Sequence, residues 1–260
     1  MHGTTAEWRD LIRMMDERYP AGHIQVTTFQ ARRKKDWFGM GSKWYRYETS
    51  LVDSKTDMEV VDLDSLEHAA NRTYRDDGIA QRGWEELAAC VRTAVECIEH
   101  DLAIYHQEPG PGVVPLTPVG PMARVILIGS SQGGTVAAAT AAHLCQRGTP
   151  PGALLLLRST ILAPHLDTLL AAGSHNPWQK LWMVQFVAQC DSQYGRARQE
   201  DQAQKLREKG HIIDTVPSGI THWDPIDFAD VLACIHTAFV YALPKPKFRC
   251  VGKRPPTFVT

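Results

Sequence analysis

The sequence has no excess of charge of either sign and no long hydrophobic run. Its 28 basic and 29 acidic side chains leave a formal net charge of −1, so no general attraction to nucleic acid is expected. The apolar run at 153–157, like every other in the chain, is far too short to span a bilayer. The first residues lack the apolar core of a signal peptide. We therefore expect a cytoplasmic protein with no nucleic-acid partner and no transmembrane segment.

The six cysteines form neither a Cys-x-x-Cys motif nor a cluster with histidine, so the common zinc and dithiol sites are not indicated. Cys90 and Cys97 lie two turns apart on one expected helix, too far apart for a disulfide. We expect all six to be reduced thiols, as in a cytosolic protein. The chain lacks a Gly-x-Gly-x-x-Gly motif after a strand and a Gly-Lys-Ser/Thr phosphate loop, so nucleotide binding is only weakly supported. No metal or organic cofactor is expected.

Segments with strand-like and helix-like hydrophobic patterns alternate along most of the chain. This alternation predicts a single α/β domain over 1–243, built on a doubly wound, mainly parallel sheet. The basic, proline-containing tail at 244–260 is expected to be disordered. Strands are expected at 23–29, 124–128, 153–157, 181–188 and 211–216. Helices are expected at 5–19, 83–105, 135–143, 201–210 and 225–242.

Four other stretches have weaker patterns. The basic run at 32–35 predicts a solvated loop, and a contact with an acidic lipid or partner surface is the alternative. The aromatic-rich stretch at 37–47 predicts a loop packed onto the body of the protein, over a site in one interpretation. Residues 51–73 are polar and poorly periodic, which predicts a loop or partial helix, and 108–121 is expected to be an exposed linker.

The most informative stretch is a Gly-x-Ser-x-Gly pentapeptide between an apolar run and an alanine-rich helical segment. The apolar run at 124–128 is followed by Gly129, Ser131 and Gly133. This strand–turn–helix context is typical of a nucleophile elbow, in which the two glycines let neighbouring backbone approach closely. The serine would then lie at the carboxyl edge of the sheet and at the start of a helix, where partial positive charge favours an anion. The alternative is an ordinary serine in a glycine-rich connection.

An acid and a histidine follow the serine along the chain, which is the order typical of proteins with a nucleophile elbow. A serine hydroxyl needs a base to take its proton, and the base is usually a histidine oriented by a carboxylate. Asp191 follows an apolar strand, and His222 follows the next strand after a turn glycine at Gly219. Both therefore lie at strand carboxyl ends, on the edge where Ser131 would lie.

The identity of the acid and of the base has alternatives. Asp167 follows the previous strand and Asp214 lies within the next one, so both are rivals of Asp191. Asp224 and Asp227 are too close in sequence to the histidine to come from a separate strand. Asp191 could instead cap the helix that follows it, and the histidine could be an ordinary loop residue.

An oxyanion hole needs two backbone donors. The amide of Gln132, directly after the serine, is expected to be one of them. The other normally comes from a loop after the third strand that often begins His-Gly, and the chain has His2-Gly3.

Together these residues resemble the acyl-protein thioesterase/carboxylesterase (phospholipase–carboxylesterase) family of α/β-hydrolases. The similar segments are His2-Gly3 with Trp8, Trp44-Tyr45, and residues 129–134, 154–159, 188–191 and 219–222. The resemblance covers nearly the whole chain, and Ser-Gln-Gly-Gly in the elbow is its most specific part. It implies an α/β-hydrolase fold with a triad of Ser131, Asp191 and His222. It also implies oxyanion donors at Gln132 and Thr4.

The chain departs from the family pattern at several places, and the linker at 108–121 and the basic tail are additions to it. Arg46 replaces the acid of the family's aromatic loop, and Ala188 replaces the glycine three residues before the acid. In the family a hydrophobic strand leads into His-Gly, whereas here Met1 directly precedes the histidine. That strand would lie between the strands at 23–29 and 124–128. We therefore expect a sheet that lacks its first strands, as in an amino-terminally truncated hydrolase.

These features predict a serine hydrolase that cleaves acyl esters or thioesters, similar to acyl-protein thioesterases. S-acylated proteins, lysophospholipids and small esters are all open as substrates, as are the acyl chain length and the oligomeric state. A transient contact with a membrane surface is also compatible with this function. The alternative function is that of a catalytically impaired or non-catalytic α/β-hydrolase-like binding protein. The missing strand is the observation that favours this alternative.

Overall fold

The structure is a computed structural model that describes residues 5–19, 26–28, 44–45, 49–53, 58–61, 63–70, 79–105, 120–173 and 180–238. The helices are α1 (Thr5–Arg18), α2 (Leu63–Ala70), α3 (Ile79–Tyr105), α4 (Gln132–Gln146), α5 (Ala163–Gly173), α6 (Arg196–Glu208), α7 (Phe228–Thr237) and the 3-10 turn η1 (Pro121–Arg124). The strands are β1 (Thr49–Asp53), β2 (Met58–Val61), β3 (Ile126–Ser130), β4 (Ala153–Leu157), β5 (Trp182–Val187) and β6 (Ile212–Pro217).

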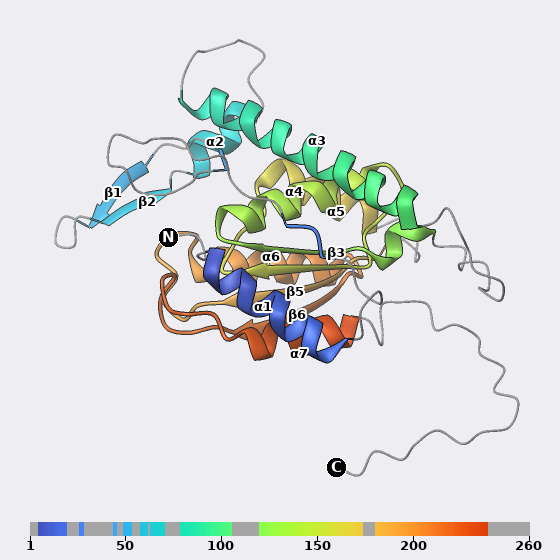
Figure 1. The fold of residues 1–260 in the computed structure, drawn as a ribbon. Helices are drawn as coiled ribbons and strands as arrows, with labels where there is room; N and C mark the ends of the chain where they lie inside the picture. The colour runs from blue at the N-terminus through green and yellow to red at the C-terminus, as the bar shows by residue number, and fades with distance from the viewer. Residues whose placement is uncertain are drawn as a thin grey trace, which may run out of the picture.

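A four-stranded parallel sheet in the order β3-β4-β5-β6 forms the centre of the molecule (Figure 1). Helices α4, α5 and α6 connect its strands in turn, which is the pattern that parallel pairing requires. Ser130 pairs with Leu157, and Leu157 is in register with Phe186. All four strands therefore end at one edge of the sheet, and the segments that follow them meet there.

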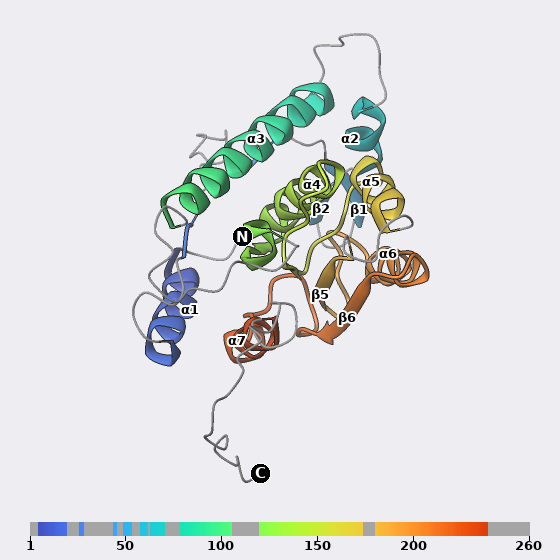
Figure 2. The same cartoon turned by 90° about the vertical axis from the view of Figure 1, so that its right-hand side faces the viewer.

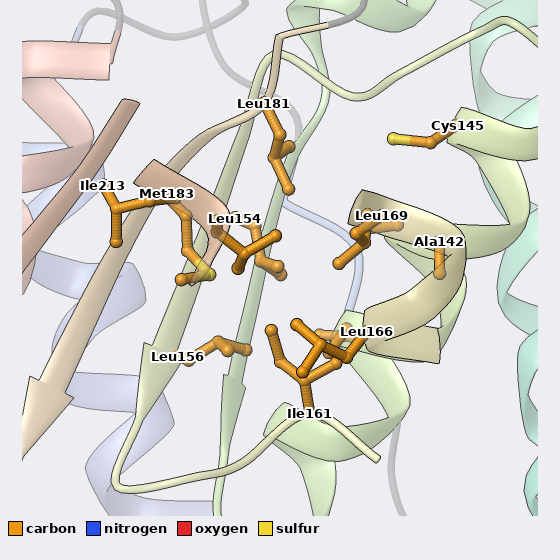
Figure 3. Packing of buried hydrophobic residues seen from close by; sticks show 14 of the residues in the cluster. Ala142, Cys145, Leu154, Leu156, Ile161, Leu166, Leu169, Leu181, Met183 and Ile213 are labelled. Atoms are coloured by element: carbon orange, nitrogen blue, oxygen red, sulfur yellow. The ribbon is translucent and has the colours of Figure 1, made fainter. Parts of the chain in front are cut away.

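Helices cover both faces of this sheet. Helices α4, α5 and α6 pack on one face, and α1 and α7 pack on the other (Figures 1 and 2). Strand β4 serves both faces because its side chains alternate: Leu154 and Leu156 point toward α4 and α5, whereas Leu155 and Leu157 face α1 and α7. Figure 3 shows Leu154 and Leu156 in one packed cluster with Leu166 and Leu169 of α5. This two-sided burial explains why the strand is continuously apolar.

Strand β3 is the outermost strand on its side of the sheet among the described residues. Ile126, Leu127 and Ile128 are only partly buried, whereas every side chain of β4 is fully buried. The long helix α3 covers the outer side of α4, so α4 lies between α3 and the sheet (Figure 2). The helix that follows β3 is thus held firmly from both sides.

The α/β class with a parallel sheet is confirmed, as are the expected elements at α1, α3, β3, α4, β4, β5, α6, β6 and α7, with shifts of a few residues at some ends. The division into one domain over 1–243 and a tail stays a prediction, because 239–260 lie outside the described residues. The basic run at 32–35 and most of the linker at 108–121 also lie outside the described residues.

Three expectations about the elements were wrong in whole or in part. Residues 26–28, within the strand expected at 23–29, do not form a strand. Residues 51–73 were expected to be a loop or partial helix; α2 confirms the helix, but the antiparallel β1–β2 pair, most of which lies in this stretch, was not expected. The paired strands satisfy the hydrogen bonds of their backbones without needing a hydrophobic pattern. Sequence periodicity therefore could not reveal them. Helix α5, at Ala163–Gly173, was not expected at all.

Candidate active site

A sharp turn joins β3 to α4 at Ser131. Strand β3 ends at Ser130, and α4 begins at Gln132. Ser131 has φ 51° and ψ −125°, a backbone conformation that residues with side chains adopt rarely and at an energetic cost. Its amide donates to the carbonyl of Leu157 at 3.0 Å, and the hydroxyl of Ser159 donates to its carbonyl at 2.6 Å. The end of β4 thus holds the strained turn in place.

Small residues make this turn possible, although they are not all the ones expected. A Cβ at Gly129 would lie 2.3 Å from the carbonyl oxygen of Gly133, which forbids any larger residue there. The expectation that Gly133 also faces backbone was wrong, because its nearest neighbour is the indole nitrogen of Trp44 at 3.3 Å. Gly134 is the more restricted position, since a Cβ there would lie 2.4 Å from Cβ of Ser159.

The structure brings Ser131, His222 and Asp191 together at the carboxyl edge of the sheet. The hydroxyl oxygen of Ser131 lies 3.0 Å from Nε2 of His222. Nδ1 of His222 lies 3.2 Å and 3.3 Å from the two carboxylate oxygens of Asp191. All three residues are buried. The carboxylate favours the tautomer with hydrogen on Nδ1, which leaves Nε2 free to accept the serine proton.

Asp191 is held in the ionised state by its neighbours. Burial alone would raise its pKa, but hydrogen bonds from His222, from the amide of Tyr194 and from the side chain of Gln199, with attraction to His222, lower the pKa below its ordinary value. The amides of Gln193 and Tyr194 donate to Oδ1 at 2.9 Å and 3.0 Å, and Nε2 of Gln199 donates to Oδ2 at 2.9 Å. The carboxylate therefore stays charged and fixed in orientation.

The loop that carries His222 is a tight turn closed by Asp224. The carboxylate of Asp224 accepts hydrogen bonds from the amides of Ile220 and Thr221, at 2.6 Å and 2.9 Å, and from the hydroxyl of Thr221 at 2.9 Å. These bonds lower the pKa of Asp224. Gly219 begins the turn with φ 73°, a conformation that favours glycine. The expectation of a turn glycine before the histidine agrees with this geometry.

The buried side chain of Arg158 also holds the loop that carries His222. Arg158 directly follows β4, has φ 47°, and is almost completely buried. Its guanidinium donates to the carbonyls of Ser218 at 2.9 Å, His222 at 3.2 Å and Pro225 at 2.9 Å, and also to that of Asp224. One side chain thereby ties the backbone on both sides of the histidine to the end of the central strand.

The side chain of Gln132 joins the elbow to the aromatic segment. Its Oε1 accepts from the amide of Trp44 at 3.2 Å, and its Nε2 donates to the carbonyl of Tyr45 at 3.2 Å. The expectation that this aromatic stretch packs onto the body is therefore met at these two residues. Gln132 opens α4, so its own amide has no partner within the helix and is available to an oxyanion. Thr4 lies outside the described residues, as does His2-Gly3.

The rival acids have other positions or partners. Asp167 lies within α5 rather than at a strand end. Asp214 accepts a hydrogen bond from the indole of Trp182 at 3.2 Å. Asp227 caps α7 through the amide of Ala229. None of these carboxylates shares a hydrogen bond with the histidine, in contrast to Asp191.

Sequence reasoning missed several residues that contact the triad or its loop, among them Arg158, Tyr194 and Gln199. A polar residue directly after a buried apolar strand is a usable signal, and it would have selected Arg158. Tyr194 and Gln199 follow Asp191 by three and eight residues and carry no pattern of their own. They reach the carboxylate only because the chain turns and begins α6 there.

No group of three or more metal-ligating side chains occurs among the residues that the structure describes. Within the described part of the chain, no disulfide is formed by the cysteines at 90, 97, 145, 190 and 234, and Cys250 lies outside that part. Within that part, no helix is long and apolar enough to cross a membrane.

The four-stranded parallel sheet with helices on both faces gives the chain an α/β fold. The strained serine, the acid and the histidine lie at one edge of that sheet. Several solved structures are similar to the chain, including the following two. Acyl-protein thioesterase 2 from Zea mays has a TM-score of 0.38 and 11% identity, over 76% of this chain and 72% of that chain. Carboxyl esterase 2 from the mycorrhizal fungus Tuber melanosporum has a TM-score of 0.35 and 12% identity, over 70% and 72%. No protein-family model and no curated protein matches this chain.

Proposed function

We propose that this protein is a serine hydrolase of acyl esters or thioesters. The observation that carries the proposal is the hydrogen-bonded chain from Ser131 through His222 to Asp191 on a strained turn. A structural serine needs neither a buried histidine at 3.0 Å nor a carboxylate behind that histidine. The positive φ of a residue other than glycine is a further sign of function, because strain of this kind is retained where geometry serves chemistry.

In the acylation step, Ser131 attacks the acyl carbonyl while Nε2 of His222 takes its proton. Asp191 keeps the imidazole oriented and stabilises its positive charge. The developing oxyanion lies at the start of α4, where the Gln132 amide donates to it and the helix dipole favours it. The second donor is the Thr4 amide, as the family resemblance implies. His222 then gives the proton to the leaving alcohol or thiol.

In the deacylation step, water attacks the acyl-enzyme and gives a proton to His222. The bond between the acyl carbon and the serine oxygen breaks, and His222 returns the proton to that oxygen. The products are a carboxylic acid and the free serine.

Two exposed apolar side chains favour an acyl substrate. Ile220 and Trp223 lie on either side of His222 in its turn and are 61% and 48% exposed. The Trp223 ring also contacts the imidazole, with centroids 4.9 Å apart. Apolar groups beside the base offer a surface for an acyl chain or an apolar leaving group. S-acylated proteins and lysophospholipids both fit this description, and comparing octanoyl and palmitoyl thioesters with lysophospholipid would distinguish them.

Replacement of the serine tests the proposed function. We expect Ser131→Ala to lower kcat for a p-nitrophenyl ester by more than about a thousandfold, because the acyl-enzyme cannot form. A fluorophosphonate probe should label the wild type and leave the variant unlabelled, since only an activated serine reacts.

The adjacent serine in β3 provides the matched control. Ser130→Ala should keep both hydrolysis and labelling, because Ser130 is not part of the hydrogen-bonded chain. Activity of Ser131→Ala near the wild-type rate, or a wild type that neither labels nor hydrolyses esters, would contradict the proposal and favour a binding protein.

A further inference from the structure

One tyrosine contacts all three members of the triad. The phenol oxygen of Tyr194 lies 3.4 Å from the hydroxyl oxygen of Ser131. Its ring meets the imidazole of His222 edge-on, with centroids 5.4 Å apart and an interplanar angle of 61°. Its backbone amide donates to Oδ1 of Asp191 at 3.0 Å.

Tyr194 is held rigidly in this position. It lies in the turn after β5 that is closed by the bond from the amide of Gly195 to the carbonyl of Asp191 at 3.1 Å. Its side chain is 2% exposed and belongs to the buried cluster that includes Tyr45 and Leu162. This dense packing holds the phenol beside the nucleophile.

The direction of the hydrogen bond follows from the proton count. Asp191 accepts from Nδ1 of His222, so Nε2 is the unprotonated nitrogen and accepts the only proton of the Ser131 hydroxyl. The serine oxygen then has only lone pairs left to offer. Tyr194 must therefore be the donor.

On the basis of the function proposed above, we propose that Tyr194 is a further catalytic residue whose phenol donates a hydrogen bond to the serine oxygen at its moments of negative charge. In acylation, that oxygen becomes more negative as His222 removes its proton. In deacylation, the oxygen takes the electron pair of the breaking acyl bond before His222 returns the proton. The phenol keeps its own proton throughout. The bond is long at 3.4 Å in the resting site, and such contacts shorten when charge develops.

Tyr194→Phe tests the inference, because it removes the hydroxyl and retains both the ring and the amide bond to Asp191. We expect acylation and deacylation of a p-nitrophenyl ester, measured by stopped-flow, each to slow by about tenfold with little change in KM. The labelling rate with a fluorophosphonate should fall by a similar factor, because that reaction also uses the serine oxygen. The midpoint of thermal unfolding should move by only a few degrees at most.

Tyr19→Phe is the matched control. The Tyr19 hydroxyl lies 3.2 Å from Nδ1 of His236, between α1 and α7 and away from the triad. Its loss should leave all three rates unchanged. A wild type that hydrolyses and labels, together with a Tyr194→Phe variant within twofold of it in every rate, would overturn the role of Tyr194 alone. A wild type that does neither would instead overturn the proposed function.

A fluorinated tyrosine at position 194 gives a readout that a packing role would not move. Fluorination makes the phenol more acidic while the ring keeps its shape. We expect the acylation and deacylation rates at neutral pH to change with the acidity of the phenol, because a more acidic phenol is a stronger hydrogen-bond donor to the serine oxygen. Unchanged rates in the fluorinated enzyme would contradict the donor role even if Tyr194→Phe failed to fold.

Discussion

At the scale of single residues, the site depends on glycines that lack a Cβ at two crowded positions next to Ser131. Ser131 can hold its unfavourable backbone conformation because Gly129 and Gly134 leave room for it. The hydroxyl of Ser159 then fills the space beside Gly134 and binds the carbonyl of the nucleophile. The sterically restricted position is therefore the second glycine of the Gly-Gly pair.

Alanine substitutions at Gly133 and Gly134 should show which of the two positions is sterically restricted. We expect Gly134→Ala to lower the free energy of unfolding by about 2–3 kcal/mol and to reduce kcat strongly, because the new Cβ meets the buried side chain of Ser159. Gly133→Ala should cost about 1 kcal/mol or less, since it meets the edge of the Trp44 indole at 3.3 Å. Urea unfolding and steady-state kinetics check this order, and equal losses would contradict it.

At the scale of elements, the catalytic loops are held by side chains from neighbouring strand ends. Arg158 at the end of β4 ties down the His222 turn, and Gln199 of α6 fixes the carboxylate of Asp191. Glu67 of α2 binds Arg198 of α6 and accepts from the amide of Ala163 at 2.8 Å. Helix α2 thereby connects to the elements that carry the acid.

Removal of the guanidinium should misplace the histidine. We expect Arg158→Met to lower kcat by about tenfold or more and the free energy of unfolding by roughly 2–4 kcal/mol, because buried carbonyls lose their donor. Urea unfolding and ester hydrolysis measure both effects. Arg147→Met is the control, since Arg147 forms an exposed pair with Glu99 that contributes roughly 0.5 kcal/mol. Equal losses in the two variants would contradict a special role for Arg158.

At the scale of the whole molecule, two histidines make the fold sensitive to acid, His211 being buried and His165 half-buried. Burial lowers the pKa of His165 to about 4, and its ring stacks on Trp84 with centroids 5.1 Å apart, which joins α5 to α3. Burial also lowers the pKa of His211, whose Nδ1 accepts from the amide of Leu181 at 3.0 Å. Both rings are neutral in the folded protein at pH values where the unfolded chain already binds a proton.

Stability should therefore fall as the pH falls. Between about pH 6.5 and pH 4 the unfolded chain binds a proton at His165 that the folded chain does not, so the free energy of unfolding decreases on acidification. We expect a loss of about 2 kcal/mol from pH 7 to pH 5 from this residue. His165→Phe retains the stacking on Trp84 and should reduce the slope, while the share of His211 remains. Urea unfolding at the two pH values measures it, and identical slopes would contradict this assignment.

The sequence by itself determined the parts of this protein that depend on local pattern. The uninterrupted leucines of β4, the apolar stripe of α3 and the glycine-flanked serine each predict their own structure, because periodicity and backbone freedom are local properties. Ser131, Asp191 and His222 each follow a different parallel strand. This placement also predicts that they meet, since parallel strands end at one edge of the sheet.

Only the tertiary structure decided how those residues are held. Arg158, Tyr194 and Gln199 reach the site because three strand ends and the start of α6 converge there. The β1–β2 pair was equally beyond the sequence, since cross-strand hydrogen bonds form between backbones that hydrophobic patterns do not describe. Contacts between residues far apart in the chain depend on the register of strands and the direction of turns. A pattern along one dimension does not contain that information.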